Sequence, residues 1–186
     1  MKGEGKRNNA KCLAYVAAFI VFQTAVILVF ALTVMRIKSP KVRFGAVAVE
    51  SFSSGSSSNS PSFEMKLVAQ VTVKNTNFGH FKYENSTVTI FYGGMPVGEA
   101  VIEKGRARAR QTKKININID ISSSRLSSNS NLGNDMNAGV LPLSSQAKLS
   151  GKVHLLKVIK KKKSGEMSCT MGINLATRSV QDLKCK

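Results

Sequence analysis

The sequence of 186 residues contains no tryptophan, two histidines and three cysteines. Three cysteines are too few for a small scaffold held together by many disulfides, and two histidines leave little material for a metal site built on imidazole. The sequence also lacks a G-x-S-x-G nucleophile motif, a G-x-x-x-x-G-K phosphate-binding loop and an H-E-x-x-H zinc motif. We therefore expect neither an enzyme nor a cofactor, and we interpret His80 and His154 as surface or sheet residues.

Acidic residues are scarce: 10 of them face 28 lysines and arginines, which gives a formal net charge of +18. A charge of this size indicates an acidic partner or surface. The candidate contacts are a lysine run at a predicted hairpin tip and three arginines on one face of a predicted extended stretch: Lys160, Lys161, Lys162, Lys163, Arg106, Arg108 and Arg110. The same lysine run is also typical of a solvated turn that prevents edge strands from pairing.

The run of residues 12–35 contains no charge. It exceeds the ~20 apolar residues that a membrane-spanning helix needs, whereas a buried helix of a soluble protein rarely lacks charge on every face. A cleaved signal peptide is the other alternative, but its apolar core is normally only ~7–15 residues long. We therefore predict a single uncleaved transmembrane helix.

The predicted span divides the chain into a basic cytosolic tail (1–11), the anchor helix (12–35), a basic linker (36–43) and one β domain (44–186). The tail and the linker each carry four cations, so the positive-inside rule does not decide the orientation. Cys12 lies where the tail meets the span, a common setting for S-palmitoylation and also for an unmodified cysteine. An anchor and a lack of aromatics between the cations argue against nucleic acid as a partner.

After residue 40 the apolar pattern changes to a period of two, most clearly over residues 63–73 and 115–121, which indicates half-buried strands. The expected strands are 41–52, 63–73, 87–92, 97–102, 108–121, 146–159, 167–175 and 180–185. Residues 53–62 are predicted to form a flexible hairpin loop, 122–131 a polar stretch and 132–140 a short helix. Seven or eight strands without a crossover helix favour an all-β, antiparallel β-sandwich of immunoglobulin or fibronectin-III type.

Three segments and their order carry a family resemblance: residues 68–77 with Asn75-Thr76-Asn77, residues 144–155, and the ending with Cys169 and Cys185. With the N-terminal anchor, the chain resembles the plant late embryogenesis abundant group-2 proteins, also called harpin-induced-like or water-stress-and-hypersensitive-response domain proteins. The family turn motif is Asn-Pro-Asn, and Thr76 in place of proline predicts a looser turn. The resemblance implies a non-enzymatic plasma-membrane protein with an extracytosolic β domain, linked to stress and defence.

Cys169 and Cys185 have two possible arrangements. If the last two predicted strands form a hairpin, its centre falls at Thr177 and the two cysteines lie opposite each other, within reach of a disulfide. If the chain instead runs straight, they lie ~53 Å apart and cannot bond. We favour the disulfide, which requires an oxidising compartment.

Asn85-Ser86-Thr87 matches the N-glycosylation acceptor pattern. A glycan on Asn85 would place the β domain outside the cytosol. The expected function is that of an interaction module at the cell surface, with anionic lipid, acidic cell-wall polysaccharide or other proteins as partners. The alternative is a lipid-binding or lipid-transfer module, in which residues 63–73 and 115–121 line an apolar slot instead of a filled core.

Overall fold

The computed structural model describes residues 4–57, 60–126, 131–155 and 159–186, and the chain divides into two units, Met1–Ile37 and Lys38–Lys186. Parts of four predicted segments lie outside the described residues: positions 1–3 of the tail, 58–59 of the serine-rich loop, 127–130 of the polar stretch and 156–158 of the predicted strand 146–159.

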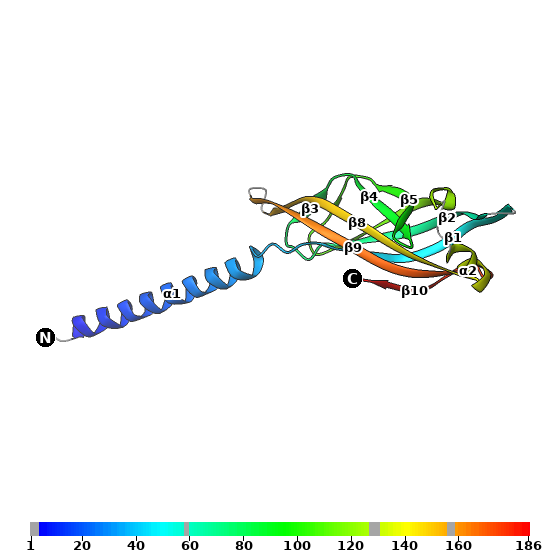
Figure 1. The fold of residues 1–186 in the computed structure, drawn as a ribbon. Coiled ribbons are helices and arrows are strands. Elements are labelled where there is room, and N and C mark those ends of the chain that lie inside the picture. The colour runs from blue at the N-terminus through cyan, green and yellow to red at the C-terminus, as the bar shows by residue number, and fades with distance from the viewer. Residues whose placement is uncertain (1–3, 58–59, 127–130, 156–158) are drawn as a thin grey trace. The chain divides into compact units, whose positions relative to one another are not determined.

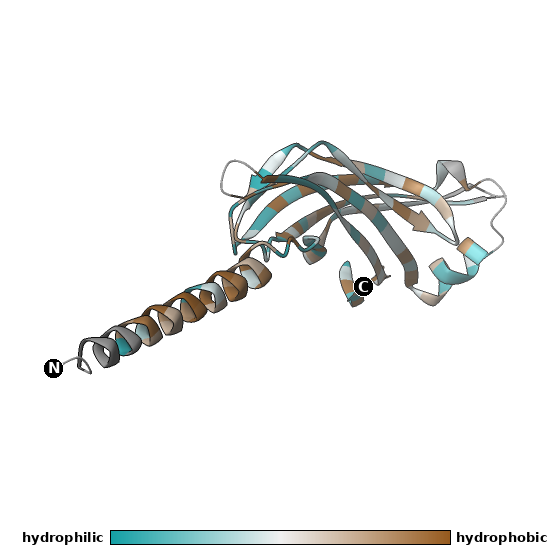
Figure 2. Ribbon diagram, turned by 90° about the vertical axis from the view of Figure 1, so that its left-hand side faces the viewer, coloured by the Kyte–Doolittle hydropathy of each residue, from teal (hydrophilic) through white to brown (hydrophobic). Residues whose placement is uncertain are grey.

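The first unit contains one helix, α1 (Glu4–Val34), which begins inside the predicted tail. Its segment Lys11–Val34, 24 residues long, has the length and apolar composition needed to cross a bilayer. Most residues of this segment are apolar, and most of its ribbon is brown, the colour of hydrophobic residues (Figure 2). The hydroxyls of Thr24 and Thr33 donate to the carbonyls of Val21 and Val29, each at 2.8 Å. These bonds satisfy polar groups that an apolar environment would otherwise leave unpaired.

The second unit is built almost entirely of strands (Figure 1). The strands are β1 (Lys41–Ser57), β2 (Ser60–Lys74), β3 (His80–Tyr83), β4 (Ser86–Tyr92), β5 (Met95–Ile102), β6 (Gly105–Ala107), β7 (Thr112–Ser122), β8 (Val140–Leu155), β9 (Ile159–Asn174) and β10 (Ser179–Cys185). A 3₁₀ turn, η1 (Ser123–Arg125), and a short helix, α2 (Asn131–Ala138), follow β7. Every strand pairing is antiparallel, which confirms the predicted fold class, with ten strands in the described residues instead of seven or eight.

Hydrogen bonds link these strands in the order β1-β2-β7-β5-β4-β8-β3-β6, and β9 pairs with β8 and β10. The sheet curls back on itself, because β9 packs against the start of β1: a Cβ added to Gly165 would lie 2.6 Å from the carbonyl oxygen of Pro40. The predicted sandwich is thus nearly a closed barrel. Closure leaves one apolar face inside, where it can form a single core.

Period-two alternation in β2 and β7 directs one set of side chains inward. Leu67 and Ile119 are register partners, and each is no more than 1 % exposed. Burying each such side chain contributes ~1.5–3 kcal/mol to folding. The Tyr92 hydroxyl donates to the carboxylate of Asp135, in α2, at 2.7 Å. Burial first, and then this hydrogen bond and the charge of Asp135, raise the pKa of Tyr92.

Several predicted boundaries were wrong. The serine-rich segment is not a loop up to residue 57, because the pairing of β1 with β2 continues to Ser57 and Ser60; ladder hydrogen bonds use backbone groups and need no apolar side chain. β1 begins at Lys41, as the predicted strand 41–52 does, so its first three residues are also those assigned to the linker. The strands β3 and β6 were not predicted, since four and three residues are too short for alternation to show.

Candidate functional site

Asn75 and Asn77, in the loop between β2 and β3, are 1 % and 4 % exposed. The Asn75 Nδ2 group donates to the carbonyls of Gly79, Ala107 and Arg108 at 2.8, 3.3 and 3.0 Å. Its Oδ1 atom accepts from the backbone N–H and the Nδ2 group of Asn77 at 3.1 and 3.0 Å. The motif therefore holds two loops together through buried amides, and the looser turn expected from Thr76 stays a prediction.

Asn77 also binds the segment that enters the β unit. Its Oδ1 atom accepts from the N–H of Lys38 at 2.6 Å, and its Nδ2 group donates to the carbonyl of Lys38 at 2.8 Å. Gly79 lies against the end of β8, where an added Cβ would be 2.2 Å from the His154 carbonyl oxygen. The entering chain, loop 75–79 and the end of β8 therefore meet at one end of the β unit, which we call the linker end.

Near the linker end, four cations occupy directly opposed positions on neighbouring strands. Arg106 of β6 pairs with Lys82 of β3, Lys82 with Lys152 of β8, and Lys152 with Lys162 of β9. Directly opposed residues of antiparallel strands share one face of the sheet. All four side chains are exposed, and we call them the cationic row.

A second row runs beside the first, two residues closer to the linker end. His80 of β3 pairs with His154 of β8, and His154 pairs with Lys160 of β9. Partial burial and the nearby charges of Lys82, Lys160, Lys152 and His80 lower the pKa of His154. The imidazole is therefore mainly neutral at pH 7 and can act as donor and acceptor.

The cations of these two rows form no ion pair within the described part of the chain. The salt bridge found there joins Lys148 to Glu166 at 3.1 Å, at another position on β8 and β9. The nearest acidic position by register is Glu84, which follows β3 and whose N–H donates to the Ser150 carbonyl. Glu84 lines one pocket with Lys152 and Lys162, so a single carboxylate stands beside several cations. The face keeps a net positive charge and is available to an anionic partner.

The four lysines predicted to contact an anionic partner do not all lie on the same face of the sheet. Lys160–Lys163 do not form a turn, because they lie in β9 and pair with residues 151–154 of β8. Lys160 and Lys162 fall on the outer face with the rows, whereas Lys161 and Lys163 have the opposite parity, and Lys163 is half-buried. The lysine run therefore supplies one cation to each row.

The three arginines do not lie in one extended stretch, because β6 ends at Ala107 and residues 109–110 form a turn. Arg106 belongs to the cationic row, and Arg108 follows β6. Arg110 has a left-handed backbone conformation (φ 57°), and its guanidinium lies 4.9 Å from the centre of the Phe78 ring and donates to the Thr76 carbonyl at 3.3 Å. Arg110 therefore stabilises loop 75–79 through a cation–π contact.

The structure joins Cys169 and Cys185 in a disulfide. The two cysteines are register partners on β9 and β10, and their sulfur atoms lie 2.00 Å apart. The turn between the strands spans residues 175–178. The sequence allowed a hairpin or a straight chain, and the structure has the hairpin. The bond ties the C-terminal strand to the sheet.

Asn85 and Cys12 remain predictions as modification sites. Asn85 is exposed before β4, and its Oδ1 atom accepts from the N–H of Lys104 at 2.6 Å. A glycan joined to its nitrogen leaves this bond in place. Cys12 lies in α1 as a free, exposed thiol.

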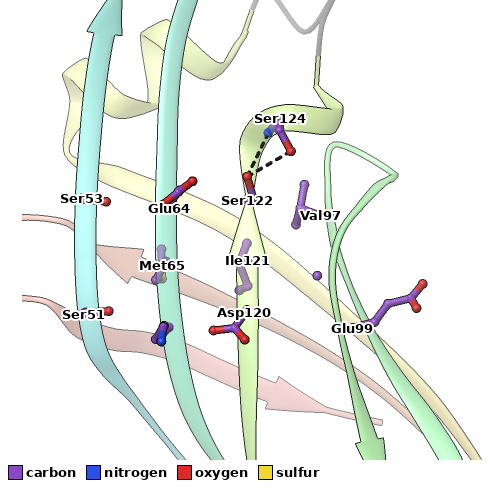
Figure 3. Close-up of a pocket in the computed structure, with 12 residues that line it drawn as sticks. Ser51, Ser53, Glu64, Met65, Val97, Glu99, Asp120, Ile121, Ser122 and Ser124 are labelled. Carbon is purple, nitrogen blue, oxygen red and sulfur yellow. Dashed lines mark hydrogen bonds between the residues drawn. The ribbon is translucent and has the colours of Figure 1, made fainter.

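A surface pocket of about 570 Å³ lies over β1, β2, β5 and β7 (Figure 3). Its rim is polar, with the carboxylates of Glu64, Glu99 and Asp120 and several serines, among them Ser122 and Ser124, which are hydrogen-bonded at 3.1 Å. Apolar residues of β2 such as Leu67 are buried in the core beneath the sheet. Within the described residues, no group of three or more His, Cys, Asp and Glu is arranged to hold a metal ion.

Comparison with known proteins places this architecture in a family. A family model described as "Late embryogenesis abundant protein" matches residues 70–171. The chain is 35 % identical over 178 residues to "Late embryogenesis abundant protein At1g64065" of Arabidopsis thaliana. The aligned region covers 95 % of this chain and 83 % of that protein. The chain belongs to the late embryogenesis abundant family. This family is linked to plant stress, and its members are generally not enzymes.

Two solved structures are similar to the chain. The solution structure of AT1g01470 from Arabidopsis thaliana has a TM-score of 0.50 at 17 % identity and covers 75 % of this chain and 83 % of that one. A protein from Archaeoglobus fulgidus has a TM-score of 0.36 at 11 % identity, covering 68 % and 94 %. The first of these likenesses supports the antiparallel β fold.

Sequence reasoning missed Lys82, Lys152 and the two histidines as members of one surface. Lys82 lies in a strand too short to predict, and its partner Lys152 is far away in the sequence. The sequence does show that these residues alternate with apolar ones, as in Lys152-Val153-His154. This alternation assigns them to the outer face of a strand, but it does not say which residues of the neighbouring strand they oppose.

Proposed function

We propose that the chain is a single-pass membrane protein whose β unit lies outside the cytosol and acts without catalysis as an interaction module at the plasma membrane in stress and defence responses. In this arrangement α1 spans the bilayer with its N-terminus in the cytosol. The observation that carries the proposal is the Cys169–Cys185 disulfide, in a chain that also has a helix of spanning length.

The disulfide supports an extracytosolic position because cytosolic thiols are kept reduced. Both cysteines are in direct register, and Cys169 is 1 % exposed, so the bond is protected once formed. The acceptor triplet at Asn85 is exposed on the same unit and is available to the glycosylation machinery of that compartment.

A binding role without catalysis is supported by the surroundings of the two histidines. His154 is opposed by His80 and Lys160 across the sheet. A general base of the serine-hydrolase type needs a hydroxyl on one side and a carboxylate on the other. Here the opposed residues are another histidine and a lysine, with Lys82 and Lys152 nearby. The lysines attract an anionic partner instead.

Sidedness tests the proposal directly. The full chain is expressed in plant cells, and sealed protoplasts are treated with protease. We expect the β unit to be digested from outside, and glycosidase treatment to raise gel mobility in the wild type but not in the matched variant N85Q. Alkaline extraction should leave the chain in the membrane, which separates an anchor from a cleaved signal. A protease-protected β unit with free Cys169 and Cys185 thiols would contradict the proposal.

A further inference from the structure

The cationic row has a regular geometry. Arg106, Lys82, Lys152 and Lys162 stand on four neighbouring strands at opposed positions. Strands in a sheet lie ~4.8 Å apart, so the row places one positive charge about every 4.8 Å over ~14 Å. We propose that this row binds a linear acidic polysaccharide, an unbranched polymer of uronate type whose carboxylates succeed one another along its chain.

The fold gains nothing from this arrangement. Like charges at directly opposed positions of antiparallel strands are destabilising, and these four cations form no ion pair among the described residues. Lys66, on β2, shows the contrasting case, because its register partner is Asp120. Among the described residues, Glu84 is the one carboxylate in the pocket that Lys152 and Lys162 line, so the row keeps a net positive charge, which a ligand that supplies negative charge would explain.

The cationic row is open at one end, where β6, which carries Arg106, ends the strand order. At the other end, β10 does not reach Lys162, because it pairs with β9 only between Cys169 and Asn174. The chain at Ser39 and Pro40 lies there instead, since Ser39 lines a pocket with Lys162 and an added Cβ on Gly165 would lie 2.6 Å from the Pro40 carbonyl oxygen. A polymer laid across the four strands can therefore continue past the β6 edge of the sheet, whereas a small anion would contact only part of the row.

The second row adds donors for the same ligand. His80, His154 and Lys160 lie two residues along the strands from the cationic row, a separation of ~7 Å. Imidazole and ammonium groups at that distance can donate to the hydroxyls and carboxylates on one side of a sugar chain. The two rows thus form one surface with a charged line and a hydrogen-bonding line.

An acidic polysaccharide fits this surface better than lipid headgroups do. The cationic row crosses the strands on the outer face of the sheet instead of gathering on the loops of the linker end. The inference rests on the proposed function, because acidic polysaccharides occur outside the cytosol. Binding in vitro is nevertheless independent of sidedness, so failure of the topology experiment and failure of this one are distinguishable.

The test uses the full chain in nanodiscs of zwitterionic lipid, with polygalacturonate as the probe and its methyl-esterified form as the uncharged control. We expect binding to polygalacturonate that weakens with added salt, and much weaker binding to the ester. The triple variant K82Q/K152Q/K162Q should bind about tenfold more weakly, a factor of about two for each exposed ion pair lost.

A matched variant separates the row from net charge. K66Q/K148Q/K184Q also removes three positive charges, but from exposed positions elsewhere on the β unit. This variant should weaken binding less than twofold. Equal losses in the two triple variants, or binding of the ester as tight as that of the acid, would overturn the proposal. So would binding to discs that contain phosphatidic acid when polygalacturonate does not bind.

A melting curve excludes loss of folding as the cause. Because the row is self-repelling, K82Q/K152Q/K162Q should melt at the same temperature as the wild type or higher. A lower melting temperature for this variant than for the wild type would show that the row serves the fold, and would overturn the inference.

Discussion

Asn77 binds both backbone groups of Lys38, accepting from its N–H at 2.6 Å and donating to its carbonyl at 2.8 Å. A side-chain amide here does what a neighbouring strand would do, because it pairs one donor and one acceptor of the entering chain. The contact fixes where the chain from α1 joins the β unit, beside loop 75–79. It also explains why a turn motif contains two asparagines that are almost fully buried.

Replacing Asn77 by alanine should release the entering chain. The variant N77A loses the two bonds to Lys38 and leaves Oδ1 of Asn75 without its side-chain donor, so we expect the free energy of unfolding to fall by about 1–3 kcal/mol. Hydrogen exchange of the Lys38 amide should accelerate more than that of amides in β2. The matched variant T76A removes no side-chain bond of this network and should exchange like the wild type. Unchanged exchange at Lys38 in N77A would refute the contact.

The disulfide is expected to stabilise the β unit measurably. It closes a loop with a sequence separation of 16, for which the chain-entropy model gives ~3 kcal/mol. The variant C169S/C185S should therefore unfold at a lower denaturant concentration, with a free energy of unfolding reduced by that amount. The variant C12S, which changes the free thiol, should unfold like the wild type. The difference between wild type and C169S/C185S should vanish in reducing agent. If reduction leaves the wild-type midpoint unchanged, the bond does not contribute to stability.

The sequence predicts those strands that are long enough for the alternation of apolar and polar residues to be recognised within the strand itself. In β2 and β7 the alternation of residues such as Leu67 and Ile119 continues long enough to exclude a helix. β3 has four residues, of which Phe81 and Tyr83 face inward, and so short a pattern predicts nothing. The serine-rich ends of β1 and β2 are strands because of backbone pairing alone.

The candidate site depends on register, which the sequence does not contain. Lys82 meets Lys152 only because β3 pairs with β8 at that offset, and a slip of one residue would place Val153 there instead. Likewise, the role of Asn77 depends on a contact with Lys38 across 39 positions. The disulfide was predictable because a single hairpin sets its register.

Two buried serines should respond in opposite ways to loss of the hydroxyl. Ser123 is 7 % exposed, and its Oγ atom accepts from the N–H of Phe63 at 2.8 Å. Ser145 is 0 % exposed, and its Oγ atom has no hydrogen-bond partner among the described residues. S123A should therefore destabilise the protein by about 1–2 kcal/mol, and S145A should be neutral or stabilise it by about 1 kcal/mol. Denaturant unfolding of both variants gives the comparison, and a marked loss in S145A would contradict it.

The protonation of His154 should depend on both pH and salt. Its pKa is lowered below the ordinary value of 6.5 by burial first and then by the charges of Lys82, Lys160, Lys152 and His80. Salt screens the charges but not the burial, so an NMR titration of the imidazole should give a pKa that rises with added salt and remains below 6.5.

The lowered pKa has a consequence for stability. The unfolded chain binds the His154 proton more readily than the folded chain, so stability falls as the pH drops below 6.5 towards the folded-state pKa and is unaffected above that range. H154Q should remove this part of the pH dependence, because glutamine keeps a polar side chain that does not titrate. Denaturation midpoints between pH 7.5 and pH 5 measure the effect. A wild-type protein that loses no more stability on acidification than H154Q would show that the imidazole titrates as it does in the unfolded chain.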